Sequence, residues 1–224
     1  MPRLPFRLLL PARSVPITRW RAPSRWRASP LTLLVLLAGL WMFGTGEGLL
    51  IDAGLGVSPW TVLAQGSARV LGTGVGVATF LVSVAVLLLW VPLRQRPGLG
   101  TLANAVVIAV SLGVAVAVLP DPEALGWQLG EVLLGIALIG VGSGCYLTTG
   151  LGPGPRDGLM TGLHLLTGVG VTPVRLGIEV AVLTAGWLLG GTVGLGTVLF
   201  ALLVGPSVGY GLALSGWLGR QRSR

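Results

Sequence analysis

Long apolar runs separated by short polar stretches dominate the sequence. Each run is close to the 20 or so apolar residues that a helix needs to cross a bilayer. Two further stretches, 54–72 and 150–169, are rich in glycine and proline and too polar to span alone. This pattern predicts an all-α membrane protein with two short, broken helices and six transmembrane helices, at 31–50, 75–93, 100–119, 127–149, 172–190 and 196–218.

The sequence repeats itself at an interval of 96 residues. When 54–117 is laid on 150–213 without a gap, 22 of 64 positions are identical. Each half holds three spans, and because three is an odd number, the second half must enter the membrane in the opposite direction. We therefore predict two inverted-topology repeats, at 31–119 and 127–218.

Composition and charge agree with a membrane location. Only 10% of the residues are charged and the mean hydropathy is +0.87, whereas soluble domains carry about 25% charged residues. Ten of the fifteen arginines lie in the arm 1–30 or the tail 219–224. The positive-inside rule then predicts that both termini are cytoplasmic, in a multi-pass protein of the bacterial inner membrane.

The arginine-rich ends favour contact with anionic lipids over nucleic-acid binding. We expect the proline-rich arm to be disordered in the cytoplasm. A cleavable signal peptide is the competing interpretation, but the first apolar run is long for a signal core.

The two broken segments are the best candidates for a functional site. Ser58-Pro59 and Gly154-Pro155 occupy matching positions in the two halves, and each is a favourable helix start. Paired broken helices in inverted halves are typical of a transporter's central site. Helices lying flat at the two interfaces are the alternative. From the first half, Trp60 and Thr61 are candidate substrate-binding residues.

The second half supplies four charged candidates. Arg156 and Asp157 begin the second broken segment, where a carboxylate also stabilises free helix N–H groups. Arg175 and Glu179 lie four residues apart, on one side of the fifth span. They either form an ion pair that locks helix packing or face a hydrated cavity. The repeat counterpart of Asp157 is the uncharged Thr61, so the two halves differ chemically.

Other chemistry is not indicated. The lone His164 and Cys145 have no partners at metal-ligand spacing, and no catalytic constellation or cofactor motif is visible. We therefore expect no enzyme activity, no metal and no cofactor. Glu47 and Asp52 are expected near an outer helix end, facing a vestibule or solvent. A homo-oligomer is compatible with the sequence.

Several segments resemble the YczE/YyaS/YitT-like bacterial integral membrane proteins. The resemblance covers about 31–218 and rests on 150–159 (GLGPGPRDGL), 175–179 (RLGIE), 186–191 (GWLLGG) and the Gly205-Pro206 pair. It implies a multi-pass inner-membrane protein, in a family that is sometimes described as transporter-like.

These features together favour a small-solute permease with a midplane site between the two repeats. Two arginines beside a helix N-terminus favour an anionic or zwitterionic solute. The alternative is a non-transporting membrane scaffold or assembly factor, in which the charged residues only lock the packing.

Overall fold

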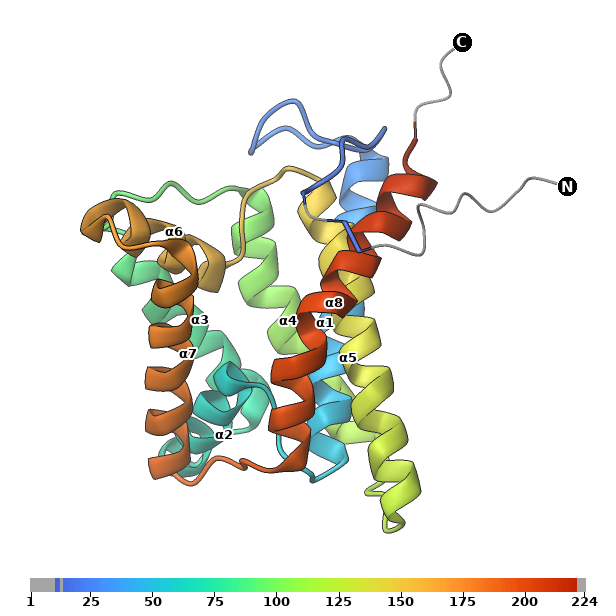
Figure 1. The fold of residues 1–224 in the computed structure, drawn as a ribbon, viewed down its shortest axis with the longest axis vertical. Coiled ribbons are helices and arrows are strands. Elements are labelled where there is room, and N and C mark those ends of the chain that lie inside the picture. Colours follow the sequence, from blue (N-terminus) through green and yellow to red (C-terminus); the bar gives the residue numbers. More distant parts are fainter. Residues whose placement is uncertain (1–10, 13, 221–224) are drawn as a thin grey trace, which may run out of the picture.

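The computed structural model describes residues 11–12 and 14–220, and its regular elements are all helical. The described residues form eight helices (Figure 1): α1 (Pro30–Asp52), α2 (Pro59–Leu71), α3 (Val75–Leu89), α4 (Leu99–Val118), α5 (Leu125–Thr148), α6 (Pro155–Thr167), α7 (Val171–Leu188) and α8 (Leu195–Leu218). The predicted all-α membrane fold is confirmed.

Five of these helices, α1, α4, α5, α7 and α8, are each long and apolar enough to cross a membrane. The predicted span at 75–93 is shorter than expected, because its helix α3 ends at Leu89. The chain bends by 110° between α2 and α3, and a sixth span arises only if this bent pair is taken together.

The helices of the two halves recur in the same order. α2, α3 and α4 begin at Pro59, Val75 and Leu99, and α6, α7 and α8 each begin 96 residues later. Figure 1 shows α6 near the end of the molecule where α1 begins and α8 ends, and α2 toward the opposite end. Both short helices follow a break in the chain rather than continuing the preceding span.

Two long helices, α1 and α5, pack closely at the centre through glycines. A Cβ atom built on Gly39 would lie 2.8 Å from the Gly142 carbonyl oxygen, and one built on Gly46 would lie 2.6 Å from that of Gly135. These two contacts are repeat-related, since Gly39 corresponds to Gly135 and Gly46 to Gly142. Small residues allow such close backbone approach in membranes.

Each central helix carries a flanking helix at its side. Gly44 and Gly48 of α1 adjoin Ser111 and Ala115 of α4. The corresponding glycines of α5 adjoin α8, as Gly140 does at Ser207. A central layer is thus formed by four helices, in the order α4, α1, α5 and α8. The other four helices, α2, α3, α6 and α7, are arranged against this layer.

The loops that break the chain dock across the two halves. Leu55, in the first break, accepts a hydrogen bond from the Gly196 N–H at the start of α8, at 2.7 Å. Leu151, in the second break, accepts one from the Gly100 N–H at the start of α4, at 2.9 Å. Each break is therefore held by the first turn of a helix from the other half.

The described part of the N-terminal arm is packed, which differs from the expected disorder. The Trp20 indole is 6% exposed and its Nε1–H donates to Thr148 Oγ1 at 3.0 Å. Ala22 N–H donates to the Thr149 carbonyl at 2.8 Å, and Arg19 N–H donates to that of Gly219 at 2.9 Å. The two backbone hydrogen bonds satisfy carbonyls at the ends of α5 and α8, which their own helices leave free.

Replacing Gly142 with alanine is expected to destabilise the fold. The new Cβ would lie 2.5 Å from the Gly39 carbonyl oxygen, so α1 and α5 must separate. We expect a loss of about 1–3 kcal/mol, measured by denaturation of the purified protein in detergent. Gly130→Ala, also on α5 but with no described atom near the new Cβ, is the matched control and should be at least as stable as the parent. Equal stability of the two variants would contradict the proposed packing.

Candidate functional site

A cavity of about 310 Å³ lies at the centre of the molecule, and residues from all eight helices line it. The first turns of both short helices reach it, through Pro59 and Trp60 of α2 and through Pro155 and Arg156 of α6. Much of the lining is repeat-related, since Thr79 and Ser83 correspond to Arg175 and Glu179. The cavity therefore lies where the two halves meet.

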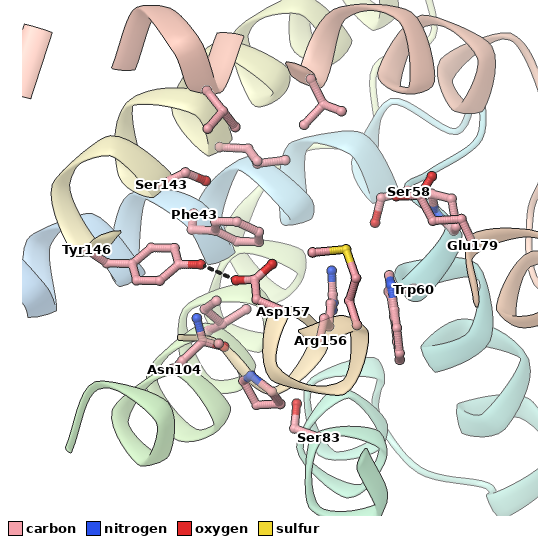
Figure 2. A pocket seen from close by; sticks show the side chains of 18 of the residues that line it. Phe43, Ser58, Trp60, Ser83, Asn104, Ser143, Tyr146, Arg156, Asp157 and Glu179 are labelled. Carbon is pink, nitrogen blue, oxygen red and sulfur yellow. Dashed lines mark hydrogen bonds between the residues drawn. The ribbon is translucent and has the colours of Figure 1, made fainter. Parts of the chain in front are cut away.

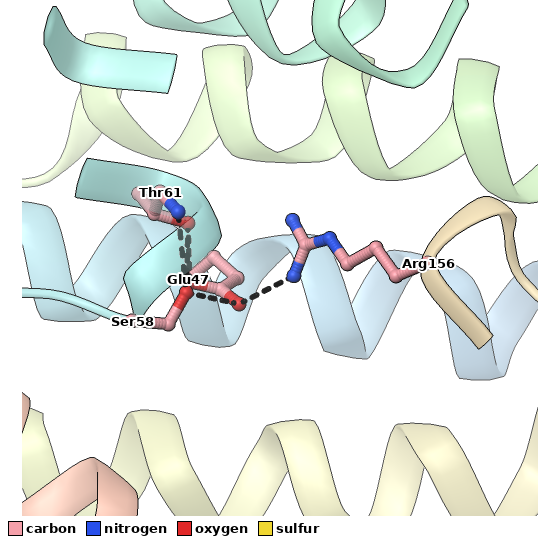
Figure 3. A network of polar contacts seen from close by, with 4 residues as sticks. All are labelled: Glu47, Ser58, Thr61 and Arg156. Atoms are coloured by element: carbon pink, nitrogen blue, oxygen red, sulfur yellow. Dashed lines mark hydrogen bonds and ion pairs between the residues drawn. The ribbon is translucent and has the colours of Figure 1, made fainter. Parts of the chain in front are cut away.

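A buried carboxylate holds the N-terminus of α2 (Figure 3). Glu47 of α1 is 0% exposed and accepts hydrogen bonds from two hydroxyl groups of α2 and its cap. The Ser58 hydroxyl lies 3.0 and 2.8 Å from the two carboxylate oxygens, and the Thr61 hydroxyl donates to Oε2 at 2.7 Å. Ser58 also caps α2, because its side chain accepts from the Thr61 N–H.

Arg156 links the two broken helices. Its Nη1 lies 3.8 Å from Glu47 Oε1, so a cation at the start of α6 faces the carboxylate that anchors α2. Its guanidinium also lies over the Trp60 ring, 5.2 Å from the centroid. The Arg156 side chain remains 29% exposed whereas Glu47 has no exposure, which leaves the arginine available to the cavity.

Asp157 anchors α6 in a similar way. The Tyr146 hydroxyl of α5 donates to Asp157 Oδ2 at 2.8 Å (Figure 2). In the first half the acid is on the long helix and the hydroxyls are on the short one. In the second half the acid is on the short helix and the hydroxyl is on the long one. Each short helix is thus fixed to its own long helix by a carboxylate–hydroxyl contact.

Arg175 and Glu179 form the ion pair that their spacing allows. Arg175 Nε donates to Glu179 Oε1 at 2.8 Å, and the two side chains are 55% and 34% exposed. Both residues line the cavity from α7. Pair formation and orientation toward the cavity, which the sequence presents as alternatives, occur together.

The cavity brings together five of the six candidate residues, namely Trp60, Arg156, Asp157, Arg175 and Glu179. Thr61 lies behind this lining and binds Glu47 instead. The expectation that Glu47 faces a vestibule or solvent is wrong. The turn after α1 reverses the chain, so the start of α2 returns alongside Glu47 and buries it.

Sequence reasoning also missed two hydroxyl groups at this site. Ser143 is 4% exposed and lines the cavity as the repeat counterpart of Glu47, and Tyr146 corresponds to Leu50. The sequence did contain a signal for this arrangement. The first half has an acid on its long helix, at Glu47, whereas the second half has its acid on the short helix, at Asp157. Among the described residues, no group of three histidine, cysteine or acidic side chains is placed to hold a metal ion.

The fold and the cavity define a polytopic α-helical membrane protein with a polar central site. The chain belongs to the family of unknown function DUF6198, whose model matches residues 31–211. The resemblance to YczE and YyaS is thereby confirmed.

Three relatives illustrate the family. An "Uncharacterized protein" of Haemophilus influenzae is 47% identical over 88% of this chain and 90% of its own length. The "Uncharacterized membrane protein YczE" of Bacillus subtilis is 36% identical, covering 80% and 84% of the two chains. The "Uncharacterized protein YyaS" of the same organism is 28% identical, covering 75% and 85%. No solved structure matches the chain.

Replacing Thr61 with valine is expected to destabilise the protein by about 1.5–3 kcal/mol. This change keeps the side-chain shape but removes one hydrogen bond to the buried Glu47 carboxylate. The matched control is Thr79→Val, because the Thr79 hydroxyl donates only to the Val75 carbonyl of its own helix. The free energy of unfolding in detergent measures both. Equal losses would show that the Glu47 network contributes no special stability.

Proposed function

We propose that this protein is a small-solute permease of the bacterial inner membrane, with its binding site in the central cavity. One observation carries the proposal: the chain breaks at equivalent places in both halves, and both restarted helices begin at one cavity. Irregular backbone at membrane depth is tolerated only where protein or a water-filled cavity satisfies it. Transporters use such breaks to expose helix ends to a solute.

The position of the short helices supports an inverted arrangement of the halves. α2 and α6 lie toward opposite ends of the molecule, as halves of opposite orientation require (Figure 1). We propose that α2 and α6 are re-entrant and that the pseudo-twofold axis passes through the cavity. Rocking of one half against the other would then expose the site to each side in turn.

The charges of the cavity favour a zwitterionic solute. Two arginines, Arg156 and Arg175, face the site together with Asp157 and Glu179. The positive ends of two helix dipoles add to the cationic side. A solute that carries both a carboxylate and a cationic group meets complementary partners here. The volume of about 310 Å³ is at the small end for ligand sites and limits the solute to a small molecule.

A second candidate is a membrane scaffold or assembly factor without transport. It is favoured by the ion pair of Arg175 with Glu179 at 2.8 Å, in which each charge already has a partner within the protein. In a scaffold the same pair would only stabilise helix packing.

Replacing Arg156 with glutamine is expected to reduce uptake into proteoliposomes by about ten- to a hundredfold, the weight of one charged hydrogen bond. The probes are radiolabelled amino acids with neutral side chains, compared with monocarboxylates of similar size. Arg69→Gln is the matched control, because Arg69 lies in the last turn of α2 and does not line the cavity. The scaffold function would be favoured by two results together. The parent protein would take up none of the probes, and the cellular phenotype of each variant would change only in proportion to its loss of stability.

Both termini are expected to be cytoplasmic. In the proposed orientation the arginine-rich ends and Arg156 lie on the same side, in accord with the positive-inside rule. A reporter fused after Arg224 should be active only as a cytoplasmic reporter, and one inserted in the loop at Asp121 only as a periplasmic reporter. A periplasmic signal from the C-terminal fusion would contradict the orientation.

A further inference from the structure

Four arginines from two distant parts of the chain gather beside the starts of α1 and α4. Arg25 and Arg27 lie in the arm just before α1, and Arg94 and Arg96 lie in the loop between α3 and α4. The Arg25 side chain joins the two segments, because its Nη1 donates to the Arg96 carbonyl oxygen at 2.9 Å. All four residues are exposed, and we term them the basic cluster.

Backbone contacts hold the basic cluster in place. The Arg25 carbonyl oxygen accepts a hydrogen bond from the Leu99 N–H, at the start of α4, at 2.9 Å. A Cβ atom built on Gly98 would lie 3.0 Å from the Arg25 Cβ, so the arm lies directly against this helix start. The fold therefore keeps like charges side by side, an arrangement that costs free energy unless an anion neutralises it.

The chain has no acidic side chain that could neutralise the basic cluster. No aspartate or glutamate precedes Glu47 in the sequence, and none lies between Asp52 and Asp121. The remaining acids lie toward the opposite ends of α1 and α4 or at the cavity. The ion pairs that the described residues form both lie at the cavity as well. The counter-charge of the cluster must therefore come from outside the chain.

The backbone of Arg94 indicates a role for its side chain. Its φ angle is +52°, and the other described residues with positive φ are all glycines. A residue with a Cβ atom adopts this left-handed conformation at a cost, which glycine does not incur. An arginine thus occupies a position where the backbone favours glycine, and such outliers gather at functional sites.

An exposed tryptophan lies within the basic cluster. Trp26, between Arg25 and Arg27, is 58% exposed. The helices that begin beside it, at Pro30 and Leu99, are both long and apolar enough to cross a membrane, so the cluster lies at the boundary of the apolar layer. Tryptophan and arginine at such a boundary are typical of contact with lipid headgroups.

We propose that the basic cluster is a binding site for the phosphate group of an anionic phospholipid. Arginine suits this ligand, because its guanidinium group binds phosphate oxygens through two parallel N–H groups. A lipid brings its phosphate to the boundary where the cluster lies, and its acyl chains contact the apolar helices and Trp26. The site lies outside the central cavity and does not depend on the permease function.

Bound lipid ties the arm to the loop between α3 and α4. The sequence alone assigns lipid contact to the two ends of the chain, and the structure adds this internal loop. The arm also packs on the second break, where the Ala22 N–H donates to the Thr149 carbonyl oxygen at 2.8 Å. The lipid site therefore adjoins the segment that leads into α6.

Lipid titration of the purified full-length protein in detergent, followed by native mass spectrometry, tests the proposal. The probes are dioctanoyl phosphatidylglycerol, dioctanoyl phosphatidylcholine and, as a soluble phosphate, glycerol 1-phosphate. We expect the parent to bind phosphatidylglycerol about tenfold or more tightly than phosphatidylcholine, since each arginine contributes about fivefold to the affinity for anionic lipid. Equal affinities for the two lipids would overturn the proposal. Glycerol 1-phosphate binding as tightly as phosphatidylglycerol would overturn the assignment to a lipid.

Arg27→Gln and Arg96→Gln are each expected to weaken phosphatidylglycerol binding about fivefold and to leave phosphatidylcholine binding unchanged. Both variants keep Arg25, whose side chain holds the two segments together. Arg220→Gln is the matched control, because it removes the same charge just after α8, outside the basic cluster. An equal loss in Arg220→Gln would show general attraction to surface charge and would overturn the site.

Arg94→Gly separates lipid binding from a role in the fold. Glycine adopts the positive φ of this position without a Cβ penalty, so the variant should melt in lipid-free detergent at the parent temperature or above. The same variant should bind phosphatidylglycerol about fivefold more weakly. Parent affinity for phosphatidylglycerol in Arg94→Gly, Arg27→Gln and Arg96→Gln would contradict the proposal.

Discussion

The need to satisfy every backbone polar group inside a bilayer governs this structure. A helix meets that need by itself, but the chain leaves the helical path after α1 and again after α5. At each break the freed carbonyl is paired with the opposite half: Leu55 with the Gly196 N–H and Leu151 with the Gly100 N–H. A helix start has unpaired N–H groups of its own, so one hydrogen bond satisfies two groups that would otherwise lack a partner within the chain.

The geometry of the cavity follows from these cross-connections. Gly56 and Gly152 adopt positive φ angles of 103° and 116°, which turns the chain back toward the centre. A Cβ atom on either would come within 2.8 Å of the threonine hydroxyl in the opposing helix start, Thr197 or Thr101. Glycine is thus required at both breaks for conformation and for space. Because each loop is pinned to the other half, both short helices begin at the same central cavity.

The sequence predicts the architecture well because the membrane imposes a simple rule on it. Apolar runs identify the long helices, and the repeat at 96 residues matches the helix starts at Pro59 and Pro155. The packing of the arm was not predictable by the same means, because its prolines and arginines are typical of disorder. Its order depends on free carbonyls at Thr149 and Gly219, which become visible only when the ends of α5 and α8 are brought together.

The site was partly predictable for a related reason. Charged residues on short or apolar helices, such as Arg156 and Glu179, are conspicuous in sequence. The role of Glu47 was not visible, since a carboxylate five residues before a helix end has the pattern of an interfacial residue. Only the reversal of the chain between Asp52 and Ser58 brings two hydroxyl groups onto it.

Repetition of sequence does not give equal halves, and the differences between them lie at the cavity. The anchoring acid lies on the long helix in one half, as Glu47, and on the short helix in the other, as Asp157. The repeat counterpart of Trp60 at the start of α2 is Arg156 at the start of α6, and the Arg156 guanidinium lies over the Trp60 ring. The repeat thus accounts for the helix arrangement that the halves share, and the differences at matched positions account for the polar lining of the cavity.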